Sequence, residues 1–188
     1  PGEELPAVVA MLNPMQNGCT YPDQSLSACA LTMKLCQGMQ KALVGNSFCK
    51  QLPIDYDPFE KYCDLVALSI ACDIVPLKEE NRTMLHFGLE KVRNNPLPGI
   101  DALKRLYEPP RDWTVSELVF YMGPLINSAG RLKHATESVV LLTGKAENLD
   151  VIAQNLNNYN QDRKSMDKVI TDHALALIAE EEVKGKRA

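Results

Sequence analysis

Two aspartates, Asp64 and Asp73, interrupt an almost continuous apolar run that extends from residue 62 to residue 77. A carboxylate buried without compensation is costly, so each must reach solvent, pair with a cationic side chain or bind a metal ion. Carboxylate oxygens are the ligands that Mg²⁺ and Mn²⁺ favour. The run therefore contains either a structural salt bridge or part of a metal site.

A second stretch, residues 121–138, breaks the helical pattern at a Gly-Pro pair and continues with small and polar side chains. Asn127, Ser128, Gly130 and Arg131 lie within five positions, and glycine lets a ligand approach the backbone closely. An amide and a guanidinium beside N–H groups at the start of a helix could bind phosphate or carboxylate. The alternative is a helix–helix turn whose arginine caps a neighbouring element.

The remaining polar candidates favour ordinary structural roles. His86 and His134 fall on amphipathic or exposed helical positions. Asp172 and His173 are adjacent, but they lie inside a long helical pattern without neighbouring ligands. We therefore expect no metal site at any of these positions.

The helix that positions the two aspartates is predicted over residues 58–74. Asp57 can cap its N-terminus, Pro58 suits the first helical position, and Pro76 requires the helix to end near residue 74. At 100° per residue, Asp64 lies about 180° from Asp73. The two carboxylates must therefore point in opposite directions.

Helical phase also predicts which of the two is buried. Asp73 shares its stripe with Val66 and Ile70, which are apolar, whereas Asp64 can reach solvent or pair with Lys61. Asp73 also lies in the last turn, where the helix dipole opposes an anion. We therefore expect Asp73 to be buried and to need a cation, either an arginine or a metal ion.

The other elements follow from periodicity and end signals. Residues 5–14 predict the one short strand, Ser25 is the expected N-cap of the next helix, and Thr114 with Glu117 forms a capping box. Trp113 is expected to be structural. Helices are predicted over residues 25–44, 81–93, 99–108 and 114–122, with one long amphipathic helix over residues 146–183.

Composition limits the possible functions. The chain has 188 residues, 45% of them hydrophobic, which suffices for one sizeable core. The net charge of -4 provides no general basic field, so any contact with nucleic acid must be local. No apolar run is long enough to span a membrane. The six cysteines form no CxxC pair and are expected to be reduced, buried thiols of a cytoplasmic protein: Cys19, Cys29, Cys36, Cys49, Cys63 and Cys72.

Three stretches, in the expected order along the chain, resemble the RecJ family of single-stranded-DNA-specific exonucleases, within the DHH phosphoesterase superfamily. "LPAVVAMLNPMQNGCTYP" is similar to the segment that follows the DHH motif. "DLVALSIACDIVPLKEENR" resembles the family pattern D-L-V-A-L-G-T-x-A-D-x-x-P-L followed by E-N-R. "GPLINSAGRL" resembles G-P-R-x-N-A-A-G-R-L.

The resemblance implies a two-metal phosphodiesterase that uses Mn²⁺ or Mg²⁺ and removes nucleotides from single-stranded DNA in the 5′-to-3′ direction. It makes Asp73 a metal ligand, and it makes Asn127, Ser128, Gly130 and Arg131 contacts to the DNA backbone. The chain departs from the pattern at a few positions. Ser69, Ile70 and Cys72 replace the family's Gly, Thr and Ala, and Leu125 replaces an arginine.

The resemblance also implies that the chain is an internal fragment, inactive by itself, because one carboxylate cannot hold two metal ions. The DHH motif would precede residue 1, and a DHHA1 domain would follow residue 188. The expected fold is mainly α: the distal part of a DHH α/β domain with one short strand (residues 1–77), a helical subdomain (78–145) and a long connector helix (146–188).

Two other functions stay open. One is a non-catalytic scaffold with the same fold, and the other is a DHH phosphoesterase that acts on oligonucleotides or cyclic dinucleotides. A non-physiological dimer through exposed core faces is also expected of a fragment.

Overall fold

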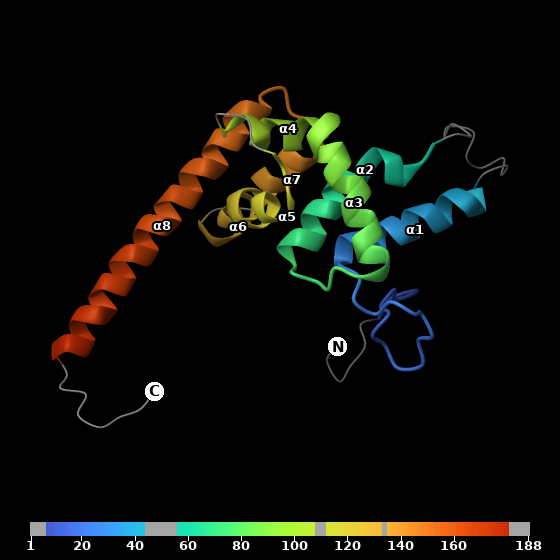
Figure 1. The fold of residues 1–188 in the computed structure, drawn as a ribbon, viewed down its shortest axis with the longest axis horizontal. Helices are drawn as coiled ribbons and strands as arrows, with labels where there is room; N and C mark the ends of the chain where they lie inside the picture. Colours follow the sequence, from blue (N-terminus) through green and yellow to red (C-terminus); the bar gives the residue numbers. More distant parts are fainter. Residues whose placement is uncertain (1–6, 44–55, 108–111, 133–134, 181–188) are drawn as a thin grey trace.

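A computed structural model describes residues 7–43, 56–107, 112–132 and 135–180 of the chain (Figure 1). Within these residues the structure is mainly helical and contains no strand. The elements are α1 (Ala28–Leu43), α2 (Pro58–Cys72), α3 (Glu79–Asn94), α4 (Pro98–Arg105), α5 (Val115–Glu117), the π-helix η2 (Leu118–Met122), α6 (Gly123–Leu132), α7 (Thr136–Thr143) and α8 (Leu149–Glu180).

Helix α2 lies at the centre of the molecule. Its start is confirmed: Asp57 accepts a hydrogen bond from the Phe59 N–H, and Pro58 occupies the first turn. Helices α1 and α3 pack against it, and η2 and α6 contact it from another side. It is consequently buried around most of its circumference.

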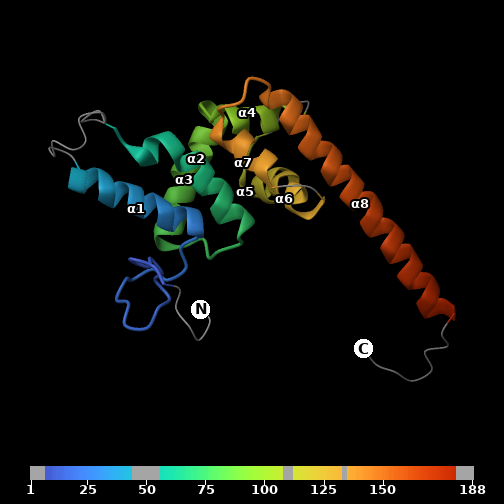
Figure 2. The same cartoon turned by 180° about the vertical axis from the view of Figure 1, so that it is seen from behind.

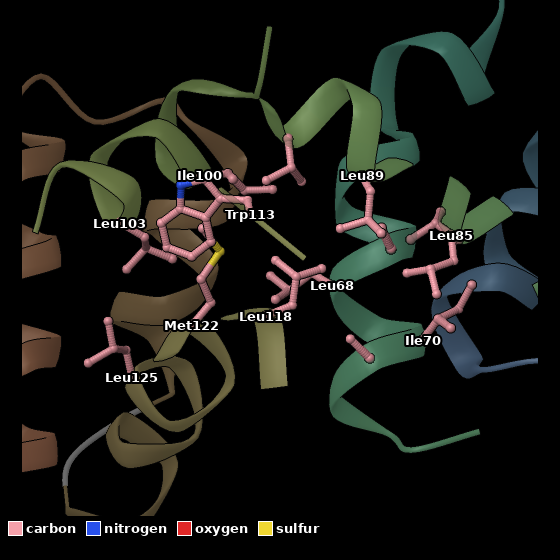
Figure 3. Packing of buried hydrophobic residues seen from close by; sticks show 14 of the residues in the cluster. Leu68, Ile70, Leu85, Leu89, Ile100, Leu103, Trp113, Leu118, Met122 and Leu125 are labelled. Carbon is pink, nitrogen blue, oxygen red and sulfur yellow. The ribbon is translucent and has the colours of Figure 1, made fainter. Parts of the chain in front are cut away.

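Helices α2 and α3 cross at very short distance because Gly88 has no side chain. A Cβ atom at this position would lie 2.3 Å from the Cys63 carbonyl oxygen and 2.5 Å from the Ala67 Cβ. The core extends from this crossing, through Leu68 and Leu89, to a cluster around Trp113 (Figure 3). Both sides of the predicted boundary between residues 77 and 78 thus share one core, and the domain division stays a prediction.

The segment around Trp113 confirms two predictions. Thr114 and Glu117 form the expected capping box at the start of α5. Trp113 is buried among core side chains that include Leu118, as Figure 3 shows, and is therefore structural. Beyond Glu117 the chain forms a π-helix and then passes directly into α6 at Gly123, where the sequence predicts a break in the helical pattern.

Helix α8 is the predicted long helix, continuous over Leu149–Glu180. Its first half packs against α4, α6 and α7, whereas its second half extends away from the rest of the molecule (Figures 1 and 2). Large apolar side chains such as Met166 and Ile170 are exposed there. Only the first half of α8 therefore contributes to the core of the described residues.

Several predictions near the N-terminus were wrong. Residues 7–14 form turns and irregular backbone instead of a strand. Helix α1 begins at Ala28, and its cap is Ser27, whose Oγ accepts a hydrogen bond from the Ala30 N–H at 3.3 Å. Ser25 instead bonds to Asp23, which draws the chain into a turn before the helix.

The described cysteines are free, as predicted, but only Cys63 among them is buried. Cys36 is exposed, the other three are partly buried, and Cys49 lies outside the described residues. No helix in the described part of the chain is both long enough and apolar enough to cross a bilayer.

Candidate metal and phosphate site

Asp73 is the residue that ends α2. Its N–H donates to the Ser69 carbonyl oxygen at 2.9 Å, and its Oδ2 accepts from the Ser69 hydroxyl at 3.1 Å. The side chain is exposed, so the prediction that Asp73 is buried was wrong. The apolar stripe is buried as far as Ile70, but Asp73 lies beyond the part of α2 that other elements cover.

Asp64 is the buried carboxylate instead. It is fully inaccessible, and it accepts hydrogen bonds from the N–H groups of Leu97 at 2.7 Å and Leu65 at 3.0 Å. The predicted solvent exposure of Asp64 was therefore wrong, because the α3–α4 connection folds over that face. Burial raises the pKa of Asp64 above its ordinary value, while the two N–H donors and Lys91 oppose the shift.

The residue after Asp73 has strained backbone geometry. Ile74 has a φ of 53°, in the left-handed region that β-branched residues avoid. Its side chain is 80% exposed, so packing does not compensate for this conformation. Strain of about 1–2 kcal/mol is typical of such residues, and it accumulates at functional sites.

The two chemically unusual stretches meet in space. Gly123, at the start of α6, packs against Cys72, and a Cβ on Gly123 would lie 2.7 Å from the Cys72 Sγ. Beside this contact a pocket of about 270 Å³ is lined by Cys72 and Ile74, on either side of Asp73, and by Asn127. The structure therefore brings the Asp73 motif and the GPLINSAGRL motif to one place.

Cys72 is an unsuitable partner for a cation at neutral pH. Burial, together with the nearby Asp73 carboxylate, raises the pKa of its thiol to about 11. The thiolate is the form that binds metals, so Cys72 remains a protonated side chain that packs against Gly123.

The predicted phosphate-binding residues lie on α6 in different settings. Asn127 is exposed, and Gly130 is exposed with open space where a Cβ would lie, since no atom comes within 4 Å of that position. Ser128 is buried, and its hydroxyl oxygen lies 2.6 Å from the Leu125 carbonyl oxygen and 3.2 Å from the Leu156 carbonyl oxygen, which are the two acceptors within reach of its single hydrogen.

These positions modify the predicted clamp. Because residues 127–131 lie inside a helix, their N–H groups are not at a helix start, contrary to the expectation. The Arg131 side chain lies outside the described part of the structure. The roles of Asn127, Ser128, Gly130 and Arg131 in binding stay predictions.

Arg163 is a site residue that the sequence reasoning missed. It lies on α8, lines the same pocket as Asn127, and is ion-paired with Asp167 at 2.5 Å. Its Nε and Nη2 also lie 3.4 and 3.3 Å from the Asn160 Oδ1. The only signal was a polar residue that interrupts the apolar stripe of the long helix. A guanidinium held in this way could bind a phosphate group.

The described residues contain no group of three or more His, Cys, Asp or Glu side chains that could hold a metal ion. Asp73 nevertheless fits as a single ligand, because its carboxylate is exposed and a hard cation prefers such oxygens. The chain can thus offer one carboxylate to a metal site.

Solved structures share this fold. The manganese complex of RecJ from Thermus thermophilus aligns with a TM-score of 0.75 and 22% identity, over 94% of this chain and 25% of that one. A second crystal structure of exonuclease RecJ bound to manganese has a TM-score of 0.68 and 22% identity, over 84% of this chain and 38% of that one. The mainly α architecture is thus that of the corresponding part of RecJ.

Sequence comparison gives the same result. No protein-family model matches the chain. The single-stranded-DNA-specific exonuclease RecJ of Salmonella typhimurium is 32% identical over 182 residues, and that of Bacillus subtilis is 31% identical over 183 residues. These alignments cover 94% and 96% of this chain but only 31% and 21% of the two relatives.

The predicted resemblance is therefore confirmed: nearly the whole chain is similar in sequence and fold to one part of the RecJ exonucleases. It spans about a third or less of the length of the curated relatives it matches.

Proposed function

We propose that this chain forms part of a RecJ-type exonuclease that hydrolyses single-stranded DNA from its 5′ end during DNA repair and recombination in the cytoplasm. The observation that carries this proposal is the shared pocket at which the Asp73 and Asn127 motifs meet. Both motifs match RecJ patterns, and the chain is 31–32% identical to RecJ exonucleases along almost its full length.

In this proposal, Asp73 supplies one ligand to a site that takes Mn²⁺ or Mg²⁺. Divalent metals in such a site activate water and stabilise the leaving oxygen of a phosphodiester. The chain itself places this carboxylate at the C-cap of α2, directly before Ile74 with its φ of 53°.

The same proposal assigns DNA-backbone contacts to the other side of the pocket. Asn127 presents an exposed amide, and Arg163 presents a positive charge fixed by Asp167 and Asn160. The open space at Gly130 would let a sugar-phosphate chain approach α6.

We further propose that the chain alone does not hydrolyse DNA. Its sequence contains no Asp-His-His triplet, which the resemblance makes the source of other metal ligands. A single carboxylate cannot hold two cations. Catalysis would then require the remaining length that the relatives possess.

The test is the Mn²⁺-dependent degradation of 5′-labelled single-stranded DNA by a protein that comprises this chain and the rest of the RecJ length. Asp73→Ala should reduce the rate at least about 100-fold, whereas Asp172→Ala, an exposed aspartate on the protruding half of α8, should leave it unchanged. Full activity of Asp73→Ala would exclude Asp73 as an essential ligand.

The same assay separates the two alternatives. A non-catalytic scaffold would bind single-stranded DNA without degrading it, with or without Asp73. A small-substrate phosphoesterase would hydrolyse dinucleotides or cyclic dinucleotides faster than long DNA. Sustained degradation of long single strands supports the exonuclease.

A further inference from the structure

Two serine hydroxyls connect the Asp73 carboxylate to the start of helix α1. The Ser69 hydroxyl lies 3.1 Å from the Asp73 Oδ2 and 3.1 Å from the Ser27 Oγ. Ser27 is only 3% exposed and accepts the Ala30 N–H. Asp73 is thereby joined, through two serines, to an N-terminal helix turn on a different element.

The direction of these bonds follows from the number of hydrogens. A serine hydroxyl has one hydrogen to donate, and an ionised carboxylate can only accept. When Ser69 donates to Asp73, the hydrogen between the two serines must come from Ser27. Ser27 then donates its hydroxyl hydrogen to the Ser69 Oγ, and Ser69 donates its own to the Asp73 Oδ2.

Ser69 stands four residues before Asp73, so both side chains lie on the same face of α2. This position is one at which the chain departs from the RecJ pattern, where a glycine is expected. A glycine has no hydroxyl and could make neither bond. The serine series therefore depends on the hydroxyl at position 69.

We propose that Ser69, supported by Ser27, is a positioning residue that holds the Asp73 carboxylate in one orientation for the metal ion. The inference rests on the proposed function, because it takes Asp73 to be a ligand. An exposed aspartate at a helix end otherwise samples several rotamers, and selecting one of them before the metal arrives lowers the entropy cost of binding. Residues that orient a ligand typically change metal affinity about 10–100-fold when removed.

The experiment measures Mn²⁺ binding directly, by electron paramagnetic resonance of free Mn²⁺, in the protein that comprises this chain and the rest of the RecJ length. Ser69→Ala should raise the Mn²⁺ dissociation constant about 10-fold, near the lower end of that range because Asp73 is exposed. Ser69→Thr retains the hydroxyl and should bind Mn²⁺ within about 2-fold of the unchanged protein. Ser165→Ala, an exposed serine on α8, is the matched control.

A second variant tests the outer member of the series. Ser27→Ala should also weaken Mn²⁺ binding, and it should lower the melting temperature as well because the α1 cap is lost. Ser69→Ala keeps the α1 cap and should therefore lower the melting temperature less than Ser27→Ala does, which separates positioning from general destabilisation. At saturating Mn²⁺ the rate of DNA degradation by Ser69→Ala should approach that of the unchanged protein.

The results distinguish failure of this inference from failure of the proposed function. If Asp73→Ala abolishes Mn²⁺ binding at its site but Ser69→Ala binds as tightly as the unchanged protein, the positioning role is refuted and the ligand assignment stands. Equal weakening by Ser69→Thr and Ser69→Ala would also refute it. If Asp73→Ala itself binds Mn²⁺ and degrades DNA normally, both are overturned.

Discussion

Replacing Asp64 should destabilise the protein without touching the proposed site. Asp64→Ala removes the acceptor of the Leu97 N–H at 2.7 Å, whereas the Leu65 N–H, 3.0 Å from Asp64, lies inside α2 and keeps its helical acceptor. A hydrogen bond to a charged acceptor contributes about 1.5–3 kcal/mol, and a donor left without a partner costs about 1–3 kcal/mol. Relief of the buried charge offsets part of this loss. Because one donor, the Leu97 N–H, loses its acceptor, we expect the free energy of unfolding to fall by about 2 kcal/mol.

Asp64→Asn provides the matched comparison. The amide oxygen can still accept the Leu97 N–H, but the amide nitrogen cannot accept the Leu65 N–H. The variant also removes the cost of burying a charge, so a loss of about 1 kcal/mol is expected. Urea denaturation followed by circular dichroism measures both values. If the free energy of unfolding of Asp64→Ala lies within about 0.5 kcal/mol of that of the unchanged protein, the stabilising role of Asp64 as a hydrogen-bond acceptor is refuted.

The pH dependence gives a second measurement of the same residue. Because burial raises the pKa of Asp64 in the folded state, the folded protein binds more protons than the unfolded chain between the two pKa values. The contribution of Asp64 to stability must therefore fall as pH rises from the ordinary pKa of 3.8 through the folded-state pKa. Asp64→Asn should lack this component, and an unchanged pH profile in that variant would contradict the assignment.

Two further predictions concern backbone geometry. Ile74→Gly should raise the free energy of unfolding by about 1 kcal/mol, because glycine tolerates the φ of 53° and little apolar contact is lost. A lower free energy of unfolding in urea denaturation would show that the turn is unstrained. Gly88→Ala should lower the free energy of unfolding by about 2–3 kcal/mol, because the added Cβ would meet Cys63 and Ala67. Gly38→Ala, with open space around it, should raise the free energy of unfolding by up to about 1 kcal/mol. Equal effects of the two variants in thermal unfolding would argue against the close helix crossing.

The two aspartates show what helical periodicity can and cannot predict. It correctly predicted one helix that begins at Pro58, contains Asp64 and ends at the cap residue Asp73. It could not predict which side is buried, because α2 is covered on several faces and Asp64 is enclosed by Leu97, a residue 33 positions later in the sequence. Burial of this kind depends on tertiary packing, and the apolar periodicity of a single helix carries no information about that packing.

The sequence predicted the candidate site, like helix α2, only in part. The sequence singled out Asp73 and Asn127, and the resemblance set them in one family pattern, but only the folded chain shows that Cys72 and Gly123 hold the two motifs together. Arg163 was missed because it comes from a third element, α8, and no local spacing connects it to the others. The serine at position 69 was noted as a departure, yet its partner Ser27 could be found only in three dimensions.

Helix α8 connects the pocket mechanically to a point far outside it. At about 1.5 Å per residue, Glu180 lies about 26 Å along the helix axis from Arg163. A tilt of about 10° around the Arg163 turn would move the far end by roughly 4–5 Å, while Arg163 itself would shift very little. Because the first half of α8 is held against α6, a displacement of the exposed end would reach the Arg163 guanidinium only as a small rotation.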